Sequence, residues 1–176
     1  MARRPRFALE GRPFLDEKNS ILPCYVSMGQ SLSHLLVHSL FSPKDRRPFL
    51  RSKELRNEIY ASMAGILKNL ACHPIKIGGL EDHLHMLCSL SKNMAFSELI
   101  GPVKGSSSKG LKEKGVHGFA WQNVYGAFSV RESNVEAVLA CMADQAEPHR
   151  KCSFQEEIRE LLKRHRVSFD ERYLWD

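Results

Sequence analysis

The chain has 176 residues, which suffice for one well-packed domain with a modest extension and are too few for two domains of ordinary size. No apolar run approaches the length of a transmembrane helix, and five scattered cysteines without CxxC spacing indicate a cytoplasmic protein rather than a disulfide scaffold or a thiolate zinc site. The formal net charge of +6 favours partners that carry phosphate groups.

The first 27 residues differ in pattern from the rest of the chain. They show no sustained helical or strand periodicity, whereas the hydrophobic pattern becomes regular from Met28 onward. We therefore expect residues 1–27 to be a flexible extension, or to lie upstream of a natural start at Met28. Residues 28–176 are expected to form the functional domain, with a C-terminal helix and tail from about residue 150.

The regular part begins with a predicted strand, a helix and a hairpin. Residues 34–41 alternate like a strand, and residues 51–70 repeat apolar side chains at three- and four-residue steps, as an amphipathic helix does. Residues 73–79 and 82–90 are two further strand candidates, and the paired glycines between them suggest a hairpin.

The second half predicts a helix, a strand and two more helices. Residues 94–115 are typical of a helix that is interrupted near Pro102, and residues 121–130 of a strand. S-x-x-E capping boxes at Ser133 and Ser153 open helices to about residues 146 and 165. This order predicts an α+β fold, a ferredoxin-like split β-α-β sandwich whose antiparallel sheet carries helices on one face, with a C-terminal helical extension.

The stretch HLHML, residues 83–87, places His83 and His85 two positions apart on one predicted strand. Alternate residues of a strand share a face, so both imidazoles point the same way, away from the core-facing side lined by Leu84, Met86 and Cys88. Neutral imidazole binds transition metals, and together with oxygen donors it accepts manganese or magnesium. The spacing indicates a divalent-metal site that needs a third ligand, or else two histidines that are satisfied by water and backbone.

The other six histidines, among them His38, are isolated in the sequence and are interpreted as packing or surface residues. In the helix that opens at Ser133, Cys141 and Gln145 lie one turn apart on the flank of the apolar stripe. The carbonyl oxygen of Gln145 is able to join a cation site. The alternative is that both are boundary residues without a chemical role.

A basic stretch accompanies the predicted helix at 94–115. Because the net charge favours partners that carry phosphate, we expect its lysines and serines to contact phosphate groups, although a solvated helix face explains the lysines equally well. The candidates are Lys104, Ser106, Ser107, Lys109, Lys112 and Lys114. If the partner is single-stranded nucleic acid, as the family resemblance given next implies, Trp121 and Phe119 are candidates for stacking on unpaired bases.

From about residue 30 to 175 the chain resembles the TnpA-type single-strand DNA transposases of bacterial insertion sequences. These are HUH endonucleases close to the REP-associated tyrosine transposases. The resemblance rests on five collinear motifs: SLSHLLVHSLFSPKDRRPFL, GGLEDHLHMLCSL, GPVKGSSSKGLKEKG, GFAWQNVYGAFSV and VEAVLACMADQAEPHRKCSFQEEIRELLKRHRVSFDERYLW. Such a set is far more specific than the histidine pair alone.

The resemblance implies binding of hairpin-containing single-stranded DNA and strand cleavage by a helix-borne tyrosine, with a 5′-phosphotyrosine link and a free 3′-hydroxyl as products. By the same resemblance His83 and His85 match the pair that holds a divalent cation, magnesium or manganese, and Gln145 matches a glutamine that reaches the same metal. Family members act as homodimers, in which the tyrosine of one subunit often serves the histidine pair of the other.

The chain departs from the family pattern at the nucleophile. The family's tyrosine, which lies four residues before the glutamine, is replaced by Cys141. A cysteine side chain is shorter than that of tyrosine, and a misplacement of about 1 Å can cost about a hundredfold in rate. A phosphorus–sulfur link is also less stable than a phosphorus–oxygen link. We therefore expect cleavage to be lost or strongly impaired.

Three hypotheses follow. The first is a metal-dependent transposase that cleaves and transfers single strands. The second is a catalytically inactive, DNA-binding relative, either decayed or recruited. The third and weakest is a metal-dependent hydrolase of small phosphoesters, for which the sequence supplies no substrate pocket.

Overall fold

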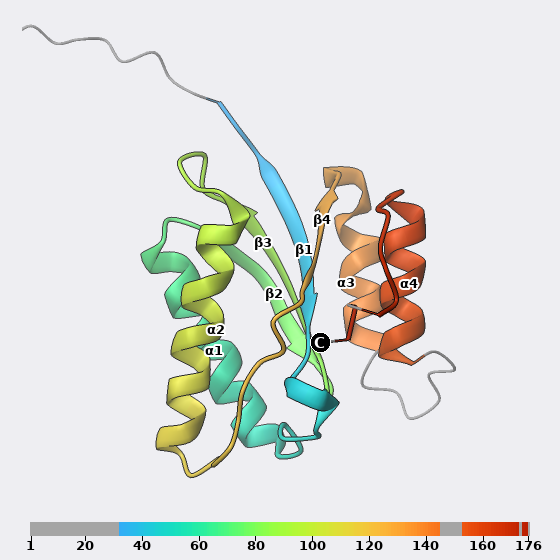
Figure 1. Ribbon diagram of the computed structural model, residues 1–176. Coiled ribbons are helices and arrows are strands. Elements are labelled where there is room, and N and C mark those ends of the chain that lie inside the picture. Colours follow the sequence, from blue (N-terminus) through green and yellow to red (C-terminus); the bar gives the residue numbers. More distant parts are fainter. Residues whose placement is uncertain (1–31, 145–152, 173, 176) are drawn as a thin grey trace, which may run out of the picture. The chain divides into compact units, whose positions relative to one another are not determined.

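The computed structural model describes residues 32–144, 153–172 and 174–175 (Figure 1). The chain divides into two units, residues 1–32 and 33–176, and the second unit contains every element described below. The predicted extension at residues 1–27 and the predicted start at Met28 lie outside the described residues.

Four antiparallel strands form one sheet in the order β2-β3-β1-β4. The strands are β1 (Leu35–Phe41), β2 (His73–Gly79), β3 (Leu84–Leu90) and β4 (Gly126–Val130). The central strands β1 and β3 are in register from Leu35 opposite Leu90 to Phe41 opposite Leu84. This strand order is that of the split β-α-β unit, so the predicted ferredoxin-like arrangement is confirmed.

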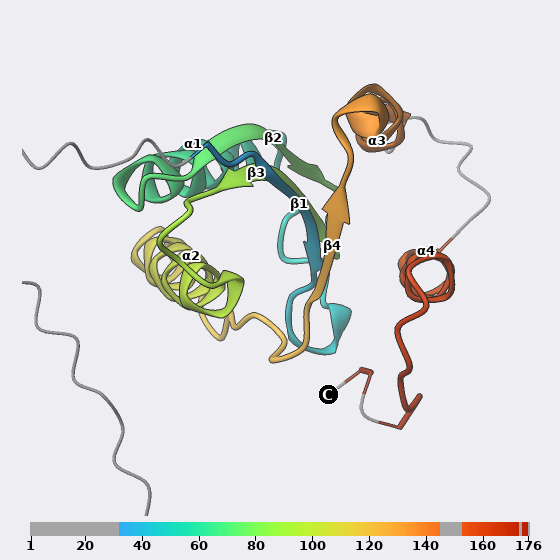
Figure 2. The ribbon, with the colours of Figure 1, turned by 90° about the horizontal axis from the view of Figure 1, so that it is seen from above.

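Helices α1 (Lys53–Asn69) and α2 (Phe96–Glu113) cover one face of the sheet (Figure 2). Helix α1 begins at Ser52, whose hydroxyl accepts a hydrogen bond from the backbone N–H of Leu55. The apolar stripes of both helices pack against alternate residues of the strands, and fully buried members of this core include Phe41, Met63, Leu67, Leu84, Met86, Cys88, Leu99, Val103 and Leu111.

The second half differs from the sequence-based expectations in three places. Helix α2 runs through Pro102 without interruption, because buried side chains on both sides of the proline, such as Leu99 and Val103, hold the helix against the core. Residues Glu132–Asn134 form a 3-10 turn (η2), so helix α3 (Val135–Asp144) begins two residues later than the predicted capping box. The last strand is shorter than predicted, and Trp121 makes an isolated bridge to Pro43 instead.

The other face of the sheet lies toward α3 and α4 (Phe154–Arg164) (Figure 1). The capping box predicted at Ser153 is confirmed, since its hydroxyl accepts from the N–H of Glu156 and the Glu156 carboxylate accepts from the N–H of Ser153. Helix α4 packs on this face through a small apolar cluster that contains Leu40, Phe128, Phe154, Ile158 and Leu162. Among the described residues, no helix has the length and apolar character that crossing a membrane requires.

Candidate metal centre

His83 and His85 lie on the face of β3 that turns toward α4. His83 immediately precedes the strand and His85 is its second residue. Their side chains share this face with Leu87, as the alternation of the sequence predicts. Both residues are buried, with 4% and 0% of their surface exposed. Helix α4 covers them, and the ring of its first residue, Phe154, stacks on His83 with 4.8 Å between ring centroids.

Nδ1 of the His83 ring is held by a carboxylate. Nδ1 of His83 lies 2.8 Å from Oδ1 of Asp82, whose other oxygen accepts a hydrogen bond of 2.7 Å from the guanidinium of Arg46. Burial favours the neutral carboxyl, but the hydrogen bonds from His83 and Arg46 outweigh it and lower the pKa of Asp82 to about 2. The ionised Asp82 therefore accepts a hydrogen bond from Nδ1 of His83, which leaves Nε2 as the nitrogen available to act as a ligand.

Nε2 of His83 is buried, and it has no hydrogen-bond partner among the described residues. A buried polar atom without a partner costs about 1–3 kcal/mol, and such atoms are rare in folded proteins. An imidazole nitrogen that presents a lone pair into a closed site suits a metal ion.

The His85 ring is anchored in the same way by a second histidine. Nδ1 of His85 lies 3.0 Å from Nε2 of His38 on β1, and the two rings are stacked. Burial, reinforced by the charge of His165, lowers the pKa of His38 to about 4. His38 is therefore neutral near pH 7 and able to accept a hydrogen bond from His85, which directs Nε2 of His85 away from β1 as a ligand atom.

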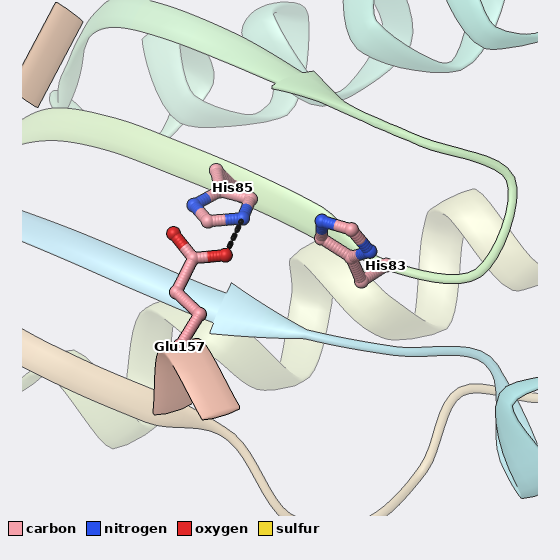
Figure 3. Close-up of side chains that lie close together, drawn as sticks. All are labelled: His83, His85 and Glu157. Carbon is pink, nitrogen blue, oxygen red and sulfur yellow. Dashed lines mark ion pairs between the residues drawn. The ribbon is translucent and has the colours of Figure 1, made fainter. Parts of the chain in front are cut away.

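A carboxylate from α4 faces the two histidines. Glu157 is 7% exposed, and its Oε2 lies 3.5 Å from Nε2 of His85 (Figure 3). One ligand atom from each of His83, His85 and Glu157 lies within 4.8 Å of the others, and this is the one group of its kind in the described part of the chain. Two imidazole nitrogens and one carboxylate oxygen form a ligand set that binds divalent cations.

The two helix residues predicted for the site have different outcomes. Cys141 lies on α3 and is partly buried, with its Sγ 3.7 Å from Oε1 of Glu157. The same thiol lines a pocket of about 280 Å³ together with His38, Glu157 and His165. The structure therefore places Cys141 next to the carboxylate that faces His85. Gln145 lies outside the described residues.

The basic stretch on α2 lies on the opposite face of the sheet from the histidines. Ser106, Lys109, Lys112 and Lys114 are exposed. Lys104 is half-buried, and its ammonium donates to the carbonyls of residues 122, 123 and 124 at 2.8–3.3 Å. Ser107 is buried, donates to the carbonyl of residue 103 and accepts from the indole N–H of Trp121.

The candidates for base stacking are wrong. Trp121 and Phe119 are buried in the core between α2 and the sheet, where their rings meet edge to face at 4.8 Å. An aromatic side chain that fills a core has no face left for a nucleobase.

Sequence reasoning missed three residues of this centre. Asp82 directly precedes His83, so its closeness to the first histidine can be seen in the sequence itself. His38 lies on the same face of β1 as Leu36 and Leu40. Its partner, His85, can be identified only from the pairing of β1 with β3. Glu157 was the most detectable of the three: it occupies the i+3 position of the apolar stripe that begins at Phe154, where a charged residue is out of place.

Comparison with known protein families identifies one family, and two solved structures are similar in fold. Residues 31–145 match the family model described as "Transposase IS200 like". Among solved structures, a candidate transposase from Deinococcus radiodurans R1 is similar with a TM-score of 0.51 and 17% identity, covering 65% of this chain and 93% of that one. A REP-associated tyrosine transposase bound to a REP hairpin has a TM-score of 0.44 and 12% identity, covering 65% of this chain and 68% of that one. No curated protein matches the chain.

Proposed function

The chain belongs to the IS200-like transposase family, and on this premise we propose that it binds hairpin-containing single-stranded DNA and acts in DNA transposition. Strand cleavage and transfer at the histidine pair is the activity that the family resemblance implies. The observation that carries the proposal is the buried Nε2 of His83, which has no partner among the described residues and lies beside His85.

We assign the cation site to His83 and His85, with Gln145 as a further candidate ligand and magnesium or manganese as the ion. The outer nitrogens of the two rings are held by Asp82 and His38, as in many metal-binding histidines, so little reorganisation is needed when an ion binds. A divalent cation held by His83 and His85 would supply Lewis-acid chemistry and partial charge neutralisation at the scissile phosphate. The buried orphan nitrogen of His83 supports this fit.

Cys141 occupies the position of the family's nucleophile, and we propose that it cleaves far more slowly than tyrosine would. Cleavage at this residue would form a sulfur–phosphorus bond to the 5′ phosphate and break the bond to the 3′ oxygen. That oxygen would leave as a hydroxyl, with the proton that the thiol gives up. The thiol contacts the carboxylate of Glu157, which supports a place for Cys141 at the centre.

The alternative is a DNA-binding relative that no longer cleaves. The replacement of tyrosine by Cys141 favours it, since a protein without cleavage retains no need for the nucleophile. Both versions predict phosphate contacts by the exposed Ser106, Lys109 and Lys112 of α2 and by Lys114 at its C-terminal end, and both predict a homodimer. Lys104 and Ser107 already have partners inside the protein, so we expect any phosphate contact of theirs to be secondary.

A covalent-adduct assay tests the proposal. Labelled single-stranded DNA with a hairpin and its flanks is incubated with the protein and manganese or magnesium, and adducts are separated on a denaturing gel. We expect a retarded complex on a native gel for the wild-type protein, little adduct for the wild type, and a strong adduct for Cys141→Tyr. Light scattering of the free protein tests the homodimer.

The outcomes distinguish a transposase that cleaves slowly from a DNA-binding relative that does not cleave. A strong wild-type adduct that disappears in Cys141→Ser would contradict the proposed impairment. Absence of an adduct from both the wild type and Cys141→Tyr, with hairpin binding retained, would favour the DNA-binding relative. Absence of hairpin binding would contradict the proposed function itself.

A further inference from the structure

We propose that Glu157 on α4 is a protein ligand of the cation held by His83 and His85, so that a two-histidine, one-carboxylate centre is assembled within one chain. The proposal rests on the metal binding proposed above and extends it to a residue beyond the matched family region, which ends at residue 145. It also makes the C-terminal helix a part of the site rather than an appendage to the sheet.

The geometry of the three side chains carries the proposal. Oε2 of Glu157 lies 3.5 Å from Nε2 of His85, and one donor atom of each residue lies within 4.8 Å of the other two. Figure 3 shows a ring nitrogen of His83 turned toward the pair formed by His85 and Glu157. Because Nδ1 of His83 is engaged by Asp82 and Nδ1 of His85 by His38, the Nε2 atoms are the ring nitrogens that would act as ligands.

Burial supplies a second, independent argument. Nε2 of His83 is a buried polar atom without a partner among the described residues, in a side chain that is 4% exposed. A carboxylate such as that of Glu157, 7% exposed, is stable in such a place when cationic or hydrogen-bonding groups surround it. A divalent cation between them satisfies the histidine and balances the carboxylate at once.

The local sequence explains why the carboxylate arrives there. The capping box at Ser153 fixes the first turn of α4, and Phe154 then seats that turn on the His83 ring. Three residues later, on the same side of the helix, Glu157 points at the sheet. Ile158 and Leu162 pack beside it, so the helix cannot rotate without exposing its apolar stripe.

This ligand set has a consequence for metal choice. Magnesium prefers oxygen ligands and retains several waters, whereas imidazole nitrogens favour manganese, zinc and other transition metals. A centre with two nitrogens and one carboxylate oxygen should therefore bind zinc and manganese more tightly than magnesium.

Calorimetric titration of the metal-free protein tests the assignment. Zn²⁺ and Mn²⁺ are titrated separately into the wild type, Glu157→Gln, Glu160→Gln and His83→Ala, with circular dichroism to show that each variant is folded. Glu160 is the matched control, because it lies one turn along on the exposed side of the same helix. We expect Glu157→Gln to bind each metal ion about 100-fold more weakly than the wild type, or weaker still, because losing a residue that only supports a ligand already costs up to about 100-fold. Glu160→Gln should bind like the wild type.

A measurement on the unmodified protein covers the case in which Glu157→Gln does not fold. The side-chain carboxyl carbon of Glu157 is followed by ¹³C NMR as Zn²⁺ is added, with that of Glu160 as the reference. We expect the Glu157 signal to shift at one equivalent while the Glu160 signal stays in place. A Glu157 signal that does not respond to saturating Zn²⁺ overturns the proposal.

Failure of this inference can be distinguished from failure of the proposed function. If Glu157→Gln binds metal as tightly as the wild type and His83→Ala does not bind, Glu157 is no ligand but the histidine site stands. If His83→Ala also binds normally, or if the wild type binds neither ion, the metal site of the proposed function falls together with this inference.

Discussion

The two faces of strand β3 are equally buried, yet they are built from opposite chemistry. Leu84, Met86 and Cys88 meet α1 and α2 on one side, and their neighbours are almost all apolar. Even the thiol fits this pattern, since burial, with a smaller effect of Cys72, raises the pKa of Cys88 to about 12 and keeps it neutral. His83 and His85 meet α4 on the other side, where each ring requires polar partners.

The difference shows that one face of β3 contributes mainly to stability and the other carries the candidate ligand atoms. Apolar side chains stabilise through burial alone, at about 25 cal/mol for each Å² of surface removed from water. An imidazole gains little from burial unless its nitrogens are hydrogen-bonded. Nε2 of His83 is buried and makes no hydrogen bond to any of the described residues. One face of the strand therefore holds the sheet to its helices, while the other keeps donor atoms ready at some cost in stability.

The largest expected effect is on the apolar face. Met86→Ala removes a fully buried side chain from the core and should lower the free energy of unfolding by about 2–5 kcal/mol, without changing metal affinity. Chemical denaturation followed by circular dichroism measures the first quantity, and calorimetry of the folded protein the second. A matching loss of metal affinity would show that the two faces are not independent.

The next largest effect is a loss of folding stability at acid pH, which arises from His38 on the histidine-bearing side of the sheet. Because the pKa of His38 in the folded protein is about 4, below its ordinary value of 6.5, the unfolded chain takes up a proton in this range before the folded chain does. The stabilisation is complete above pH 6.5 and is lost as the pH falls to 4, by about 3 kcal/mol for this one group. Denaturation of the metal-free protein at several pH values should show a weaker acid dependence for His38→Gln than for the wild type. Equal curves for the two proteins would contradict this assignment.

The contrast between the faces also explains how much could be predicted from the sequence. Alternation along residues 34–41 and 82–90, with the apolar steps of residues 51–70, was sufficient for the sheet and its first helix, because these patterns follow directly from strand and helix geometry. The same period of two placed His83 and His85 on one face. A local pattern does not contain the partners of their rings, which depend on strand register and on how α4 docks.

Helix α2 illustrates the other limit of local reasoning. A proline inside a helix removes one backbone hydrogen bond, and the sequence therefore predicted an interruption at Pro102. Tertiary packing of Leu99, Val103 and Leu111 overrides that local preference. Packing likewise turned Trp121 from a candidate for base stacking into a core residue.

The third effect tests the cost of the orphan nitrogen. His83→Leu fills a similar volume, removes the buried Nε2 and gives up the hydrogen bond to Asp82, so the two changes oppose each other. We expect the metal-free variant to unfold within about 1 kcal/mol of the wild type. Its melting temperature should no longer rise when Zn²⁺ is added. A loss of stability as large as that of Met86→Ala would mean that this histidine is a structural residue.

The smallest expected effect on stability concerns the basic side chains of α2, which lie on the helix that covers the apolar face. Replacing the exposed Lys109, Lys112 and Lys114 by glutamine should change the free energy of unfolding by less than about 0.5 kcal/mol. If all three contact phosphates, the slope of log affinity against log salt for a single-stranded hairpin probe should become shallower by about 2.

Lys104→Gln is the matched control for these lysines, because its ammonium donates to three backbone carbonyls inside the protein and burial lowers its pKa to about 8. This variant should lose about 1–3 kcal/mol of stability and leave the salt slope unchanged. Fluorescence anisotropy at several salt concentrations measures the slopes. An unchanged slope in the triple variant would remove α2 from the DNA-binding surface and leave the histidine face as the place to look for it.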